Sequence, residues 1–207
     1  MGGPLTVGIS DAQRAALATL ADRLDPTTYL AGGVAIALRF DHRSSRDLDL
    51  FTATADPSAR ADSFLDSSNP VRVVGRAEGT LHLEVNGVPT SWIRYRYPLL
   101  STPESILSVP VPVASLDDLT CMKLSAIAGR GAARDFWDLR EILKRGETSL
   151  EHALELFGRK YVTEDIGHVV KSLAYFADAD ASPLPSGLSL EEWHRIQNDF
   201  RAWVSRL

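Results

Sequence analysis

The sequence predicts an α+β fold in which a mixed sheet flanked by helices is followed by a C-terminal helical bundle. Alternating apolar residues and the preferred hairpin turn Asn86-Gly87 indicate a β-meander over residues 71–97. A proline-rich link follows at residues 109–112, and beyond it apolar residues recur at helical spacing. We therefore expect two domains, residues 1–112 and residues 113–207.

The first half begins with signals for a helix and two short strands. Ser10 can cap a helix that runs to about Leu24, because apolar residues repeat at helical spacing and Pro26 follows. A strand is expected at residues 29–31. A helix at residues 34–40, entered from a glycine turn, and a strand at residues 47–52 follow.

The second half reads as successive helices. Gly146 is a stop signal after the second of them, and two prolines make residues 177–189 a loop. The expected helices span residues 115–129, 132–143, 150–161, 164–176 and 190–204.

Composition limits the classes of function. The 207 residues are 44% apolar and 24% charged, which suits a folded chain with a sizeable core. The net charge of −5 argues against a protein that coats nucleic acid nonspecifically. The single cysteine, Cys121, excludes an internal disulfide and a multi-thiolate zinc cluster, and no segment resembles a membrane span. We expect a cytoplasmic protein without membrane contacts.

Asp47 and Asp49 are the candidate metal ligands. Residues two apart on a strand share a face, so both carboxylates can converge on one ion. Nucleotidyl transfer commonly uses two magnesium ions, which prefer hard oxygen ligands. The same pattern also occurs on ordinary solvated strand faces.

A glycine pair and a run of basic residues precede these aspartates. Gly32-Gly33 lies between a strand and a helix, where glycine lets the backbone approach a phosphate, although it also suits a simple tight turn. Arg39, His42, Arg43 and Arg46 concentrate positive charge beside the acidic pair, which suits a phosphate and a metal ion together.

Charged residues interrupt the apolar faces of two helices in the helical half. Lys123 and Arg130 fall within the apolar arc of their helix, and Asp135 falls within the arc of the next one, with Asp138 at its edge. A buried lysine needs a partner. The pattern fits either a structural ion pair or a lysine that reaches a triphosphate while Asp135 orients it or the acceptor hydroxyl.

Four ordered motifs together resemble the AbiEii/MenT family of toxin-like nucleotidyltransferases, within the DNA polymerase β superfamily. They are the run from Tyr29 to Ala35, the run from His42 to Phe51, a Lys-x-x-Ala-x-x-x-Arg match at residues 123–130, and an Asp-x-x-Asp match at Asp135 and Asp138. The resemblance implies a polymerase β-like nucleotidyltransferase core completed by the helical domain.

The resemblance also implies roles for individual residues. Gly32 and Gly33, with Arg46, Lys123 and Arg130, would bind the nucleotide. Asp47 and Asp49 would bind two Mg²⁺ ions. Lys123 and Asp135 would complete the catalytic set, with Asp138 a weaker match. The family often has serine where this chain has Gly33. The third carboxylate common in polymerase β-like enzymes is absent from residues 90–93, and Glu84 is a distant substitute.

The resemblance implies transfer of a nucleoside monophosphate from a nucleoside triphosphate to an acceptor. The expected acceptor is RNA, at the 3′ end of tRNA, and the expected role is that of a toxin held in check by a cognate antitoxin. Two alternatives remain open: a nucleotidyltransferase that modifies a small molecule such as an antibiotic, and a noncatalytic module that binds nucleotide or a partner protein.

Overall fold

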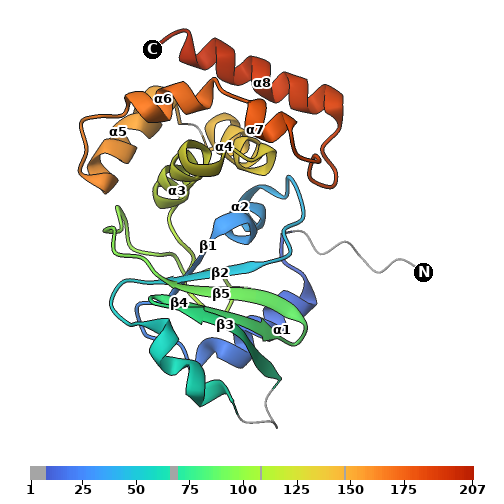
Figure 1. Ribbon diagram of the computed structural model, residues 1–207, viewed down its shortest axis with the longest axis vertical. Helices are drawn as coiled ribbons and strands as arrows, with labels where there is room; N and C mark the ends of the chain where they lie inside the picture. Colours follow the sequence, from blue (N-terminus) through green and yellow to red (C-terminus); the bar gives the residue numbers. More distant parts are fainter. Residues whose placement is uncertain (1–7, 66–69, 108, 147) are drawn as a thin grey trace. The chain divides into compact units, whose positions relative to one another are not determined.

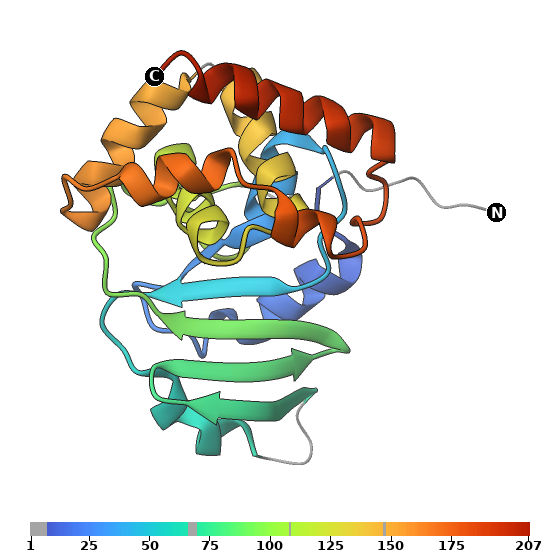
Figure 2. The same ribbon diagram turned by 45° about the horizontal axis from the view of Figure 1, so that its top comes forward.

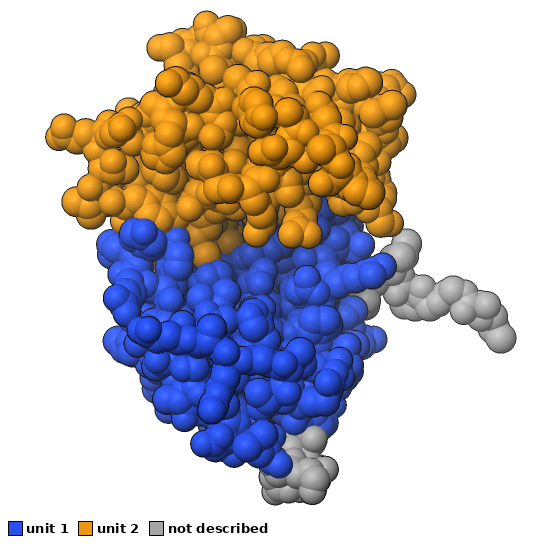
Figure 3. Space-filling view, viewed as in Figure 1, with its two compact units in different colours: residues 1–98, 102–115 blue, residues 99–101, 116–207 orange. Residues whose placement is uncertain are grey.

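The chain divides into two compact units, which Figure 3 colours separately. The computed structural model describes residues 8–65, 70–107, 109–146 and 148–207. Unit 1 comprises residues 1–98 and 102–115, and unit 2 comprises residues 99–101 and 116–207. The short segment 99–101 therefore belongs to the second unit although the chain returns to the first unit after it.

Unit 1 is built on a mixed five-stranded sheet in the order β1-β2-β5-β4-β3 (Figures 1 and 2). β2 and β5 run parallel, and the other neighbouring pairs are antiparallel. The strands are β1 (Tyr29–Ala31), β2 (Leu48–Thr52), β3 (Val71–Ala77), β4 (Thr80–Val85) and β5 (Val88–Arg94). The sheet confirms the predicted α+β class, and the meander is joined by two strands from the start of the chain.

The hairpin between β4 and β5 turns at the predicted dipeptide. Asn86 has φ 51° and Gly87 has φ 77°, the left-handed pair that a tight two-residue hairpin needs. Such a turn matches the twist of its flanking strands, and it sets their register from Val85 opposite Val88 onward. The cross-strand neighbours of β4 and β5 follow from this turn.

One face of the sheet is buried and the other carries polar residues. Leu50 and Trp92 are register partners on β2 and β5 and are fully buried. The 3-10 helix η1 (Pro57–Phe64) packs against β3, β4 and β5, and the guanidinium of Arg60 lies over the Trp92 ring. The opposite face carries Asp49 and its neighbours, so the strand alternation separates core from site.

Helix α1 (Asp11–Ala21) begins at the predicted cap. The Ser10 hydroxyl accepts the backbone N–H of Gln13, and the Gln13 side chain accepts the backbone N–H of Ser10, which completes a capping box. The expected extension to Leu24 is wrong: Asp22 is the C-cap, and the Arg23 N–H bonds the Leu20 carbonyl in a tighter turn.

Helix α2 (Gly32–Phe40) begins two residues earlier than the periodicity predicts. Its N-cap is Ala31, the last residue of β1, so strand passes directly into helix. The helix ends at Asp41, which adopts the left-handed conformation with φ 47°. The segment 41–47 then returns the chain to the start of β2.

Unit 2 is helical. Its helices are α3 (Leu116–Arg130), α4 (Ala133–Arg145), α5 (Leu150–Tyr161), α6 (Gly167–Leu173), α7 (Ala177–Asp180) and α8 (Leu190–Val204). An aromatic cluster forms the core: the Phe136 ring lies 5.2 Å from Phe176, 5.8 Å from Trp193 and 5.2 Å from Phe200, measured between centroids. These ring contacts tie α4 to the start of α7 and to α8.

The expected helix over residues 164–176 is wrong in both bounds. Asp165 takes part in a local turn, in which its carboxylate accepts the N–H of Gly167, so the helix starts only at Gly167. It ends at Leu173, and α7 lies within the segment predicted as loop. The described residues contain no helix long and apolar enough to cross a membrane.

Candidate active site

Asp49 is the second residue of β2, where its side chain is partly exposed between two buried neighbours, Leu48 and Leu50. It pairs with Ala31 on β1 and with Ser91 on β5. Asp47 is exposed and directly precedes the strand, which begins one residue later than expected. The N-terminal end of β2 therefore presents two carboxylates, one from the strand and one from the segment that leads into it.

Gly32 is required beside Asp49 for two separate reasons. Its φ of +68° is a conformation that L-residues rarely adopt. A Cβ at this position would also lie 2.9 Å from Cγ of Asp49 and closer still to Oδ2. The carboxylate thus packs directly on the backbone of the glycine turn, which brings together Gly32 and Asp49, 17 residues apart in the sequence.

Gly33 lies close to two side chains of the segment before β2. A Cβ there would lie 2.7 Å from Nη2 of Arg43 and 2.7 Å from Oγ of Ser45. A guanidinium and a hydroxyl therefore approach the first turn of α2. The sequence singled out Arg43 for its charge but gave no signal for Ser45, because a hydroxyl in a polar loop has no distinctive pattern.

The predicted basic residues separate into two groups. His42, Arg43 and Arg46 line a cavity of about 650 Å³ that also includes Ser10 and Gln13 of unit 1. Other arginines are engaged elsewhere within their own unit. Arg39 bonds Glu104 at 3.0 Å and the carbonyl of Ala114 at 2.7 Å, Arg94 pairs with Asp56 and Glu78, and Arg96 lies 3.9 Å from Glu78.

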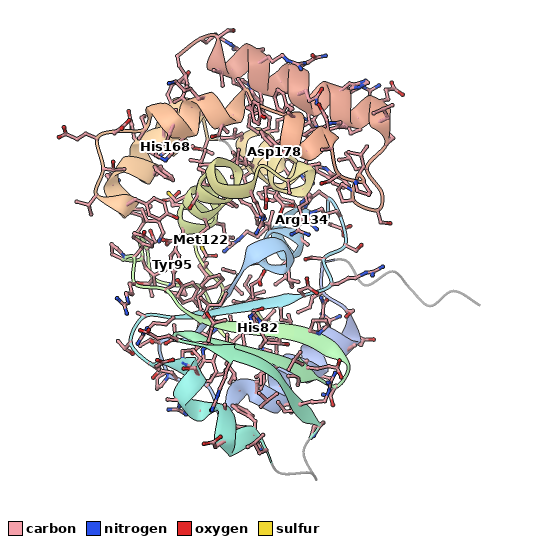
Figure 4. All side chains as sticks on the ribbon, in the orientation of Figure 1. His82, Tyr95, Met122, Arg134, His168 and Asp178 are labelled. Atoms are coloured by element: carbon pink, nitrogen blue, oxygen red, sulfur yellow. The ribbon has the colours of Figure 1, made fainter. Side chains whose placement is uncertain are left out.

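The position opposite Asp49 on β5 is occupied by a hydroxyl rather than a third carboxylate. Ser91 is the register partner of Asp49, and His82 is the partner of Ser91 on β4. Nδ1 of His82 lies 3.2 Å from Oγ of Ser91, and Figure 4 labels this histidine on the sheet. Glu84, the distant substitute, pairs with Arg72 at 2.8 Å.

The charged residues predicted in unit 2 form one network. Nζ of Lys123 lies 2.9 Å from Oδ1 of Asp135 and 2.7 Å from Oδ2 of Asp138. Arg130 donates to Asp135 from Nε and Nη2, each at 2.8 Å. Both carboxylates are fully buried, and Lys123 is 6% exposed. Two positive and two negative groups balance, so the burial of Lys123 has a structural explanation as well.

The electrostatic consequence of this network appears at Asp135. Burial by itself raises the pKa of Asp135, but the charge of Lys123 and the hydrogen bond and charge of Arg130 outweigh it. The pKa of this carboxyl therefore lies below its ordinary value of 3.8. Asp135 is ionised at neutral pH and can hold both cations in position.

Unit 2 contains a second buried ion pair, which was not predicted from the sequence. Nζ of Lys160 lies 2.6 Å from Oδ1 of Asp118, and both side chains have no exposed surface. Asp118 also accepts the backbone N–H groups of Leu100 and Ser101. The signal was present, because Lys160 follows Leu156 and Phe157 at helical spacing on the buried face of α5.

Cys121 is the small buried residue that the sequence predicts. It has no exposed surface, and burial raises the pKa of its thiol to about 12. The thiolate is the reactive form of cysteine, so this side chain serves packing rather than nucleophilic chemistry.

Comparison with known proteins identifies the family. The model of the nucleotidyl transferase AbiEii toxin family, of type IV toxin–antitoxin systems, matches residues 15–69 and 64–206. The chain belongs to this family. The AbiEii match covers both units, and the predicted resemblance is confirmed.

Individual relatives agree with the AbiEii assignment. The protein aq_aa25 of Aquifex aeolicus (strain VF5) is 38% identical over 156 residues, which span 73% of this chain and 74% of that protein. JHP933 from Helicobacter pylori shares the fold at 20% identity with a TM-score of 0.52, over 95% of this chain and 90% of that one. MenT4, a nucleotidyltransferase toxin from Mycobacterium tuberculosis H37Rv, shares it at 17% identity with a TM-score of 0.57, over 95% and 82%.

Asp47 and Asp49 of this AbiEii-family chain could supply some of the ligands of a Mg²⁺ ion. Among the described residues, no three His, Cys, Asp or Glu side chains gather as a metal-binding group. Mg²⁺ usually keeps several waters and takes one or two carboxylates together with substrate phosphates. Asp47 and Asp49 fit that pattern, because one is exposed and the other partly exposed beside a basic segment.

Proposed function

We propose that this protein transfers a nucleoside monophosphate from a nucleoside triphosphate to an acceptor hydroxyl in a Mg²⁺-dependent reaction. One observation carries the proposal: the Asp49 carboxylate packs on Gly32, and a guanidinium and a hydroxyl approach Gly33 next to it. Groups that bind a cation thus adjoin groups that bind a phosphate. A metal–triphosphate complex needs both.

Asp47 and Asp49 would hold the metal, as two ions in the usual arrangement for this reaction. Bound Mg²⁺ supplies activation of the attacking oxygen and neutralises charge on the triphosphate. The acceptor oxygen bonds to the α-phosphorus, the bond to the bridging oxygen breaks, and pyrophosphate leaves. The hydroxyl proton passes to solvent, since Ser91 stands where a third carboxylate would face Asp49.

The remaining predicted residues have supporting roles in this proposal. Gly32 and Gly33 let the triphosphate approach the backbone, and Arg46 contributes positive charge from the segment before Asp47. Lys123 and Arg130 bind phosphate oxygens, and Asp135 orients both cations. Family resemblance supports these assignments, and the short ion pairs of Asp135 with Lys123 and Arg130 support its role of orienting both cations.

We propose tRNA, at its 3′ end, as the acceptor. A terminal ribose hydroxyl can serve as the attacking oxygen at a two-metal site. The test is incubation with each labelled triphosphate, Mg²⁺ and either total RNA or total protein, followed by purified tRNA. Label on tRNA supports the proposal. Label found only on protein or on a small molecule, with tRNA present and unmodified, rejects this acceptor.

We further propose that the protein acts in the cytoplasm as the toxin of a toxin–antitoxin pair. Membership of the AbiEii family supports this role. Induced expression should slow growth, and coexpression of the neighbouring gene's product should restore it. Normal growth during high expression of a demonstrably active protein would contradict the role.

A noncatalytic nucleotide-binding protein is the second candidate. The observation in its favour is the position facing Asp49, where the chain has Ser91, while Glu84 is paired with Arg72. This candidate predicts triphosphate binding without release of pyrophosphate in the presence of every acceptor class. Release of pyrophosphate with a small polar acceptor alone would instead favour the antibiotic-type enzyme.

A further inference from the structure

Gly33 leaves a space that two side chains from a later segment enter. A Cβ at Gly33 would lie 2.7 Å from Oγ of Ser45, 3.3 Å from Cβ of Ser45 and 2.7 Å from Nη2 of Arg43. Real Cβ atoms essentially never approach other atoms more closely than 3.0 Å. The Ser45 hydroxyl therefore lies within the volume that a side chain at position 33 would need.

The position of Ser45 is fixed by a buried residue of α1. Nε2 of Gln13 donates to the carbonyl of Ser45 at 2.8 Å and to that of Arg46 at 3.1 Å, and Gln13 is 5% exposed. The Gln13 side chain is itself held by the capping box with Ser10. The hydroxyl of Ser45 is thus presented by a segment whose backbone is anchored at the carbonyl of Ser45 and at that of the next residue.

The surroundings of this hydroxyl suit one kind of ligand. The Arg43 guanidinium approaches the same glycine, and Nη1 of Arg43 donates to the carbonyl of Ser44 at 3.0 Å, which orients the side chain. Asp49 packs on the adjacent Gly32, on the cation-binding side. A hydroxyl donor and a guanidinium next to a metal-binding carboxylate match the oxygen atoms of a polyphosphate rather than a neutral ligand.

We propose that the Ser45 hydroxyl binds the triphosphate chain of the nucleotide, in place of a hydroxyl at position 33. Arg43 supplies positive charge beside it. This inference rests on the proposed function. It explains why the chain tolerates glycine at position 33: the hydroxyl comes from residue 45. A serine at position 33 would compete with Ser45 for the same space.

The test measures triphosphate binding rather than transfer. Isothermal titration calorimetry with Mg²⁺ and either inorganic triphosphate or α,β-methylene nucleoside triphosphates gives the Kd of the wild type and of Ser45→Ala, Ser45→Thr, Ser44→Ala and Gly33→Ser. We expect Ser45→Ala to bind about tenfold more weakly, as for loss of one hydrogen bond to a charged group. Ser45→Thr keeps the hydroxyl, and Ser44→Ala changes an exposed neighbour, so both should bind like the wild type.

Gly33→Ser should bind weakly. Gly33→Ser combined with Ser45→Ala should recover most of the affinity, because the Ser45 hydroxyl no longer occupies that space and the remaining close atom is the flexible end of the Arg43 side chain. Equal Kd values for the wild type and Ser45→Ala overturn the role of Ser45. A lower Tm of Ser45→Ala with an unchanged Kd overturns it as well. Absence of triphosphate binding by the wild-type protein would instead overturn the proposed function itself. The two failures are therefore distinguishable.

Discussion

The carboxylate of Asp49 packs directly on the backbone of Gly32, leaving no room for a side chain at that glycine. The antiparallel pairing of Ala31 with Asp49 produces this contact, because it sets the end of β1 beside the start of β2. A strand pairing thus determines where the proposed metal ligand meets the proposed phosphate-binding turn.

Asp49→Asn should nearly abolish nucleotidyl transfer, because the amide loses the charge that binds Mg²⁺. Initial rates over a range of Mg²⁺ concentrations are the measurement. Asp22→Asn is the matched control, since Asp22 is an exposed carboxylate at the end of α1. Normal Mg²⁺-dependent activity of Asp49→Asn would show that the metal assignment is wrong.

Gly32→Ala should lower both stability and transfer activity, and Gly87→Ala should lower stability alone. Both glycines have positive φ, so each alanine costs about 1 kcal/mol of strain. A Cβ at Gly87 meets nothing within 4 Å, whereas at Gly32 it displaces the Asp49 carboxylate. Urea unfolding gives the free energy, and the rate per folded molecule gives activity. Equal activity losses in both variants would contradict the contact's role.

Lys123→Ala and Lys160→Ala should both destabilise unit 2, by about 3–5 kcal/mol, because each removes a cation that pairs with a buried carboxylate, Asp138 in the first variant and Asp118 in the second. Only Lys123→Ala should lose activity per folded molecule, measured well below its Tm. The comparison separates the two explanations of the Lys123 network. Full activity in the folded fraction of Lys123→Ala would favour a purely structural ion pair.

Acidification should reveal the contribution of Asp135 to stability. The pKa of Asp135 in the folded chain lies below its ordinary value of 3.8, so the unfolded chain takes up the proton first as pH falls. The stabilisation is present above about pH 4 and is lost as pH falls further, through the folded pKa. Urea unfolding between pH 7 and pH 3 should show a shallower pH dependence for Asp135→Asn than for the wild type.

Arg46→Ala and Arg134→Ala should weaken RNA modification more than Arg94→Ala does. Arg46 and Arg134 are exposed, the latter labelled in Figure 4 near the start of α4, whereas Arg94 pairs with Asp56 and Glu78. Each lost phosphate contact should reduce the slope of log K against log salt by about 1. Unchanged salt dependence in both exposed variants would exclude them from the RNA surface.

The sequence predicted elements wherever local chemistry determines them. The bounds of β1, α5 and α8 agree with the structure, since serine caps begin both of these helices and a glycine turn ends the strand. The prediction of a helix over residues 164–176 is wrong because turns made by Thr163 and Asp165 override the periodicity. The domain division after residue 112 and the roles of the site residues stay predictions.

Contacts between distant residues were less accessible to prediction. The parallel pairing of β2 with β5 has no local signal, so the Ser91 position opposite Asp49 could not be read from the chain. Ser45 was missed for the same reason, because only its approach to Gly33 gives it significance. Lys123 was predicted because it falls within an apolar arc of its helix. A buried charge therefore leaves a pattern in the sequence, whereas two polar groups that meet only in the fold leave none.

The hydrogen bonds from Leu100 and Ser101 to Asp118 have a consequence for the independence of the helical half. Residues 99–101 belong to unit 2, yet residues 102–115 lie between them and α3 and belong to unit 1. A fragment that began at Leu116 would lack these two N–H donors to the fully buried carboxylate of Asp118. No single cut in the polypeptide separates the two units intact. Recombination at one junction therefore could not exchange the complete helical unit between relatives.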